Sequence, residues 1–283
     1  PDEITILRPN DVRLENAELT VLNDLTTSDL LVMIFGTLLL ERKVILLGKS
    51  ISQVSACVMA LYSILYPFQW HHTIISIVPD QLVELLQAPF PFFAGVLKNS
   101  LTDDALLHIE DGIVVDLDAK CLLKKCGDEA TLIPETLKKS LKLSLKIVEA
   151  VEKGQVINVL MAEAFHQFFI KLFANLNASN FDKNNFIEMQ KDQATKYFLE
   201  WFFETVMFKD FIERKKENEK QREANGGGVL APNYFDLFNA KILEKSATLT
   251  NQQQRKHFQT LMKNSKQKKR NMKDRIKDFL NHK

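Results

Sequence analysis

The first half of the chain contains long apolar stretches with helical spacing. Residues 30–39 place leucine, isoleucine and phenylalanine on one wide face, and residues 26–28 (TTS) before them can cap a helix. A second helix is predicted from about residue 50 to 65, where Tyr-Pro ends it, and a short one over 80–88.

Between these stretches lie short runs that are apolar at nearly every position. Three are predicted to be strands: residues 43–48 (KVILLG), 72–78 (HTIISIV) and 112–117 (GIVVDL). Residues 89–93 (PFPFF) are expected to form an ordered turn without regular structure, because two prolines interrupt them. Helices that alternate with such strands predict an α/β fold with a parallel-rich sheet flanked by helices on both faces.

Strand signals end near residue 134. Residues 135–153, 155–176 and 194–215 carry leucines or phenylalanines at helical spacing, so an all-α helical subdomain is expected to follow the sheet. The predicted organisation has four parts: a connecting segment (1–25), a central α/β unit (26–134), a helical unit (135–225) and a Gly-linked basic helical tail (226–283). The tail begins with three glycines, includes a possible docked helix at 232–243, and carries eleven basic residues against two aspartates over 251–283.

Composition narrows the class of protein only a little. The net charge is +1, from 37 basic and 36 acidic residues, which predicts no particular partner. The three cysteines, Cys57, Cys121 and Cys126, lack the spacing of a metal site or a disulfide framework and favour a reducing compartment. The longest apolar run, residues 30–40, is about half the length that a membrane-spanning helix needs. No cofactor or metal is expected.

Two segments resemble catalytic motifs. Gly48-Lys49-Ser50 stands between a strand and a helix, where a phosphate-binding loop would lie, but Lys43 occupies the position where that loop needs a glycine. A tight turn and a helix cap explain these residues better. Val115-Asp116-Leu117-Asp118 is similar to the paired aspartates of a phosphatase, yet strand-end aspartates that cap a turn are the favoured interpretation. His71-His72 has no serine or cysteine elbow to pair with.

A series of motifs resembles the DENN domain family. They are residues 38–46 (LLLERKVIL), 57–70 (CVMALYSILYPFQW), 87–96 (QAPFPFFAGV) and 114–118 (VVDLD), followed by the phenylalanine-rich segments at 164–169, 181–186 and 198–212. Phe90 replaces the small residue that is usual in the third motif. The resemblance covers roughly residues 22–215 and implies the central and downstream DENN segments, the C-terminal lobe. The longin-like first lobe of the family is not supplied by this sequence, in which residues 1–25 are expected to be only a connection.

The resemblance implies a Rab GTPase-binding fragment of a guanine-nucleotide exchange factor, which stabilises nucleotide-free Rab and performs no covalent chemistry. Such a fragment would be cytoplasmic and peripheral on vesicle or endosomal membranes. Because the family holds the Rab between two lobes, one lobe alone is expected to bind more weakly and to exchange little. The alternative is a scaffold of membrane traffic that keeps the fold without exchange activity, and an arginine-finger GTPase activator ranks third.

The Rab-binding residues expected from this resemblance lie at loop ends and strand ends. They are Glu84, Pro89, Phe90, Pro91, Phe92, Phe93, Asp116 and Asp118. The alternative for residues 89–93 is an internal plug between the sheet and the helical unit. The basic tail at 251–283 admits three interpretations: a solvated helix, a contact with an anionic membrane, or an RNA patch, which its two phenylalanines disfavour. No nucleic-acid partner is expected.

Overall fold

The computed structural model describes residues 18–151, 155–174, 176, 181–224, 238, 241 and 242. The basic tail at 251–283, the three glycines, and most of the connecting segment lie outside the described residues. So does most of the helix expected over 232–243. Of that helix, Phe238, Lys241 and Ile242 are described, and Phe238 and Ile242 are buried.

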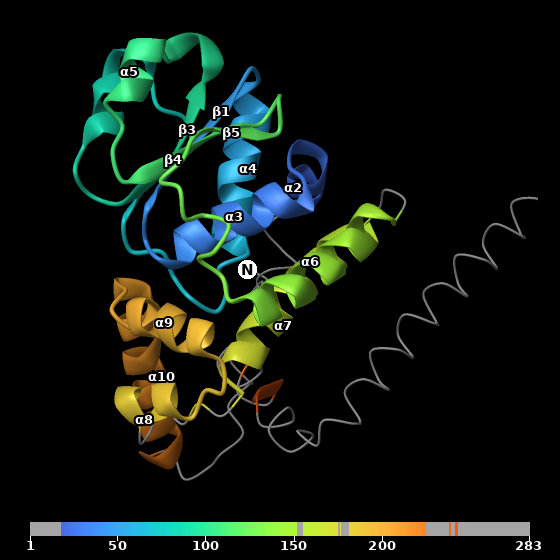
Figure 1. Cartoon of the computed structure of the whole chain (residues 1–283), viewed down its shortest axis with the longest axis vertical. Coiled ribbons are helices and arrows are strands. Elements are labelled where there is room, and N and C mark those ends of the chain that lie inside the picture. The colour runs from blue at the N-terminus through green and yellow to red at the C-terminus, as the bar shows by residue number, and fades with distance from the viewer. Residues whose placement is uncertain are drawn as a thin grey trace, which may run out of the picture.

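A five-stranded mixed sheet forms the centre of the first half of the chain (Figure 1). Its strands are β1 (Lys43–Gly48), β2 (Thr73–Ile75), β3 (Phe92–Leu97), β4 (Gly112–Asp116) and β5 (Cys121–Lys124). The strand order is β2-β3-β1-β4-β5; β5 is antiparallel to β4, and the other neighbours pair in parallel. The fold class predicted from the sequence is confirmed.

Three local expectations needed correction. The run at 72–78 forms a strand only over β2, and the helix expected over 80–88 is the 3₁₀ helix η1 (Asp80–Gln87). The turn expected over 89–93 contains the first two residues of β3, because Phe92 and Phe93 pair with β2 and β1.

The two faces of the sheet are covered by different elements. Val44 and Leu46 of β1 face a large apolar cluster that includes α3 (Ser28–Leu39) and α4 (Ile51–Ser63). Ile45 and Leu47 face a smaller cluster with η1 and α5 (Asp103–Leu107). Because successive residues of a strand point to opposite faces, an apolar residue at every position is what a doubly covered strand requires.

Helices make up the described part of the second half. They are α6 (Glu135–Glu149), α7 (Gln155–Leu172), α8 (Lys183–Glu188), α9 (Gln193–Phe202) and α10 (Val206–Ala224). The stretch predicted as helical over 194–215 is divided between α9 and α10. The large apolar cluster continues from the sheet into these helices without a gap. The division into domains at residue 134 therefore stays a prediction.

Phe68 joins the two units through their aromatic core. It belongs to the segment that follows α4, yet its ring packs against those of the helical unit. The nearest are Phe211 at 4.6 Å, Phe169 at 4.8 Å and Phe202 at 5.3 Å between ring centroids. Phe35 of α3 meets Phe165 and Phe168 of α7 edge-on. Aromatic contacts of this kind add to the stability gained by burying the rings.

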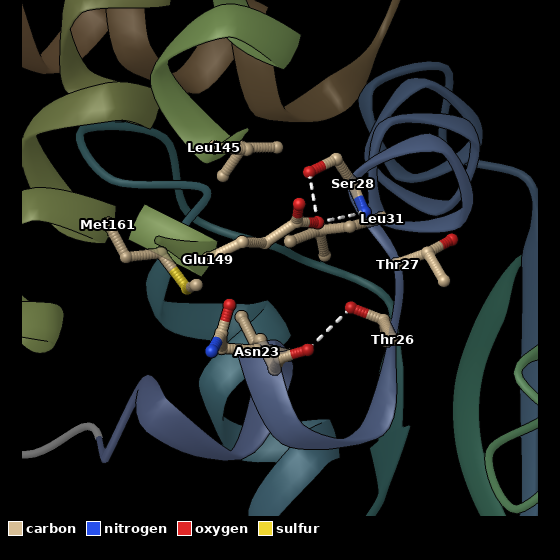
Figure 2. Close-up of a pocket in the computed structure, with 9 residues that line it drawn as sticks. Asn23, Thr26, Thr27, Ser28, Leu31, Leu145, Glu149 and Met161 are labelled. Atoms are coloured by element: carbon tan, nitrogen blue, oxygen red, sulfur yellow. Dashed lines mark hydrogen bonds between the residues drawn. The ribbon is translucent and has the colours of Figure 1, made fainter. Parts of the chain in front are cut away.

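Side chains from each unit also cap helices of the other. Glu149, at the end of α6, accepts hydrogen bonds from the backbone N–H of Ser28 (3.0 Å) and from its hydroxyl, at the start of α3 (Figure 2). Glu41, between α3 and β1, accepts from the N–H groups of Val206 (2.9 Å) and Met207 (2.8 Å) at the start of α10. These bonds satisfy N–H groups that have no partner within their own helix.

Loss of the Glu149 cap should destabilise the fold. Glu149→Ala leaves the Ser28 N–H and hydroxyl without their acceptor, so we expect the free energy of unfolding in urea to fall by about 1 kcal/mol. Glu188→Ala, at an exposed position on α8, is the matched control and should change it by less than about 0.5 kcal/mol. Equal losses in the two variants would show that the cap contributes nothing specific.

Candidate functional site

The predicted binding residues are divided between two opposite edges of the sheet. Parallel strands share one direction, so β1, β3 and β4 all begin at one edge, here called the amino edge, and end at the other, the carboxyl edge. Phe90 and Pro91 immediately precede β3 and lie at the amino edge, whereas Asp116 ends β4 and lies with Asp118 at the carboxyl edge. The structure does not bring these two groups together.

η1 connects the two edges across one face of the sheet. β2 ends at the carboxyl edge and β3 starts at the amino edge, so the chain between them must return along the sheet. Leu86 of η1 is buried and Val83 packs beside it in the smaller apolar cluster. The opposite side of η1 carries Leu82 and Leu85, whose exposed fractions are 48% and 47%.

Phe90 extends this exposed apolar surface to the amino edge. It is 51% exposed, and its ring meets that of the buried Phe92 edge-on, with 6.4 Å between centroids. Pro91 disfavours helical backbone at Phe90, which keeps the residue out of η1 and extended towards β3. We call Leu82, Leu85 and Phe90 the apolar ridge; Glu84 and Pro89 are also exposed in the same segment.

The expectation that Phe90, Phe92 and Phe93 all contact a partner is therefore corrected. Phe92 is 2% exposed and Phe93 is fully buried, because both belong to β3 and point into the clusters on the two faces of the sheet. Phe90 alone of the three presents its ring to solvent. The exposed apolar side chains of Leu82 and Leu85 were not predicted from the sequence. Their spacing of three, offset by one from the partly buried Val83 and the buried Leu86, is a signal for them.

Asp116 has an internal role. One of its carboxylate oxygens is 2.5 Å from Lys98 Nζ, and the other accepts from the backbone N–H groups of Asp118 and Ala119, both at 3.0 Å. Burial would raise the pKa of Asp116, but the bonds from Lys98 and Ala119 outweigh it and hold this pKa below its ordinary value. The buried carboxylate caps the turn from β4 to β5 and is not free for a partner. Asp118 is exposed.

Ser50 of the Gly-Lys-Ser segment and the cysteine Cys57 both occupy positions with a structural role. Ser50 is the N-cap residue of α4, and its hydroxyl is 3.0 Å from that of Ser52. Cys57 is buried, and burial raises its pKa to about 12. Within the described residues, no three His, Cys, Asp or Glu side chains are grouped so that they could hold a metal ion. None of the described helices has the length and apolar character needed to cross a membrane.

These features define the chain as a mixed α/β protein with an attached helical unit and an exposed apolar surface along η1. Residues 1–120 match the model of the DENN (AEX-3) domain family. The chain belongs to the DENN domain family, as the motifs in its sequence indicated.

The likeness to other DENN domain proteins extends beyond residue 120. The chain is 30% identical to DENN domain-containing protein 2C of Mus musculus over 264 residues. This alignment covers 88% of this chain and 28% of that protein. It is 29% identical over 232 residues to protein 2B of Homo sapiens, covering 75% of this chain and 20% of the relative. It is 29% identical to protein 2D of Mus musculus over 251 residues, and this alignment covers 85% of this chain and 51% of that protein. The chain thus spans between a fifth and a half of these relatives.

Phe90 and Phe92 should respond oppositely to truncation. Phe92→Ala removes a buried ring from the sheet and should lower the free energy of unfolding by roughly 3–5 kcal/mol, whereas Phe90→Ala should change it by less than about 0.5 kcal/mol. Urea unfolding followed by circular dichroism measures both. A large loss for Phe90→Ala would mean that its ring serves the core and not a partner.

The carboxylate of Asp116 should make stability sensitive to acid. Since its pKa is lower in the folded state, the carboxylate stabilises the fold above the ordinary pKa of aspartate, and this contribution is lost as the pH falls through the folded value. Between about pH 5 and pH 3, we expect the wild type to lose more stability than Asp116→Asn. The exposed Asp118→Asn serves as control and should follow the wild type.

Proposed function

We propose that this chain is the Rab-binding part of a DENN-type guanine-nucleotide exchange factor and that the apolar ridge is part of its binding surface. The observation that carries the proposal is an exposed row of large apolar side chains on a rigid sheet unit in a member of the DENN family. Leu82, Leu85 and Phe90 protrude from one continuous segment whose inner side is fixed in the core. Apolar anchors on a rigid support are typical of protein interfaces.

The mechanism needs no covalent step. A surface that prefers Rab without nucleotide must, by linkage, weaken the affinity of Rab for nucleotide by the same factor. A thousandfold faster release at unchanged association requires a preference of roughly 4 kcal/mol. Rigidity serves this purpose, because a surface that adapts equally to both states of Rab would give no preference.

Only some of the binding residues predicted from the sequence are exposed enough to contact a partner. Glu84, Pro89 and Phe90 lie on or beside the ridge and stay in the proposed surface. Pro91 is half-buried and positions Phe90. Asp118 is exposed, but at the far edge of the sheet, so it belongs to this surface only if a partner also covers the carboxyl edge.

Charge substitutions on the ridge test the proposal. Leu85→Asp or Phe90→Asp should weaken binding to nucleotide-free Rab by about tenfold or more, because each places a charge in an apolar contact. Leu143→Asp on α6, where the leucine is 44% exposed, is the matched control and should bind as the wild type does. Affinities are measured by calorimetry against a Rab panel in nucleotide-free, GDP-loaded and GTP-loaded forms, together with release of fluorescent GDP.

Each result separates the alternatives. Tighter binding to the nucleotide-free form supports an exchange factor, even where this chain alone accelerates release little. Equal affinity for all three forms, with no acceleration, would favour a DENN-fold scaffold. Equal losses for the ridge variants and Leu143→Asp would remove the ridge from the binding surface. Localisation at vesicle or endosomal membranes, and any contact of residues 251–283 with anionic lipid, remain further proposals about the full-length protein.

A further inference from the structure

A lysine lies at the amino edge of the sheet, on the face that carries the apolar ridge. Lys43 is the first residue of β1, beside the first residues of β3 and β4, which are Phe92 and Gly112. Because side chains alternate along a strand, Lys43 points to the same face as Ile45 and Leu47, where η1 packs.

The side chain of Lys43 is buried without a partner for its charge. Lys43 is only 4% exposed, although lysine is almost never fully buried unless it is paired. A Cβ at Gly112 would lie 2.5 Å from Lys43 Cβ, so the missing side chain at Gly112 leaves room for the lysine stem. The adjacent Arg42 pairs with Asp128, but the Lys43 ammonium makes no ion pair or hydrogen bond within the described part of the chain.

An aromatic ring is the neighbour of this ammonium, and it leads directly to the ridge. Lys43 Nζ lies 6.0 Å from the ring centroid of Phe92, whose ring meets that of the exposed Phe90. A ring attracts a cation less strongly than a carboxylate does. Nζ is not among the buried polar atoms without a hydrogen-bond partner; since it has no such partner, it must reach the surface. A positive charge in an apolar surrounding therefore opens beside Phe90.

We propose that Lys43 binds a carboxylate of the protein that docks on the apolar ridge, a role that rests on the proposed function. The carboxylate belongs to an aspartate or glutamate beside the apolar contact of the partner. One ammonium neutralises one such charge. A phosphate fits less well, because it carries about two negative charges and is bound best by several donors. The exposed Glu110 and Asp111, directly before β4, would also repel it more strongly.

This role predicts opposite effects of the charge on binding and on folding. In the free chain, a buried ammonium without a counter-charge is unfavourable for folding. In the complex, a partner that covers the ridge also excludes water from the ion pair, and so strengthens the attraction. Removal of the charge with the stem retained should therefore weaken binding without weakening the fold.

Lys43→Met in the full chain tests this prediction. Its affinity for nucleotide-free Rab, measured by calorimetry, should fall by about tenfold or more. Its midpoint of urea unfolding should equal or exceed that of the wild type. Lys49→Met is the matched control: Lys49 is exposed directly after β1, at the carboxyl edge, and its loss removes the same charge. This control should bind as the wild type does.

A double-mutant cycle then identifies the carboxylate. The acidic surface residues of the Rab are changed to their amides one at a time, and one of these changes should weaken binding to the wild type but not to Lys43→Met. Losses that add for every pair would overturn the proposal, as would a lower unfolding midpoint for Lys43→Met with unchanged affinity. If Lys43→Met binds normally while Leu85→Asp does not, the role of Lys43 is wrong and the proposed function stands. If the wild type binds no Rab, both are wrong.

Discussion

Two helices, α3 and α10, begin where a carboxylate from the other unit of the chain accepts their first N–H groups. The first N–H groups of a helix have no internal partner and must be satisfied from outside. Here Glu149 of the helical unit supplies α3, and Glu41 of the sheet unit supplies α10. Because the exchange runs in both directions, neither unit completes its own hydrogen bonding alone. The position of the start of α10 against the sheet follows from it.

The aromatic core acts together with these caps. Phe68 lies among the rings of α7, α9 and α10 although it belongs to the segment that leads to β2. Packing at this density transmits displacement instead of absorbing it. η1 lies on the other face of the sheet, where Val83 and Leu86 hold it in the smaller apolar cluster. A fixed position of this kind is what the proposed binding surface requires.

Much of the fold could be predicted from local patterns. β1 and β4 are apolar at nearly every position, and α3 has its cap residues directly before its apolar face. Both kinds of element can therefore be predicted from the local sequence. β3 was missed at its start because Pro91 and the phenylalanines around it indicate a turn. β5 is short, lies at the edge and alternates between exposed and half-buried residues, so no continuous apolar run marks it.

The candidate site was less predictable, for a physical reason. Whether a residue stands at the start or the end of a parallel strand decides which edge of the sheet it occupies, and this depends on pairing between distant segments. Asp116 and Phe90 resemble each other in the sequence, as loop-end residues beside a strand, yet they lie at opposite edges. Likewise, the role of Glu41 depends on a helix that begins at Val206, 165 residues later in the chain, and no local signal reveals it.

The place of Phe68 has a practical consequence for anyone who dissects the protein. Expression of the sheet and the helices as separate pieces, with the cut near residue 134, would leave Phe35 and Phe68 uncovered on one piece and a large set of phenylalanine rings on the other. Fragments with such surfaces tend to aggregate. Boundaries for soluble pieces should therefore be sought outside the shared core, and an insoluble half should not be taken as a sign that the intact chain folds poorly.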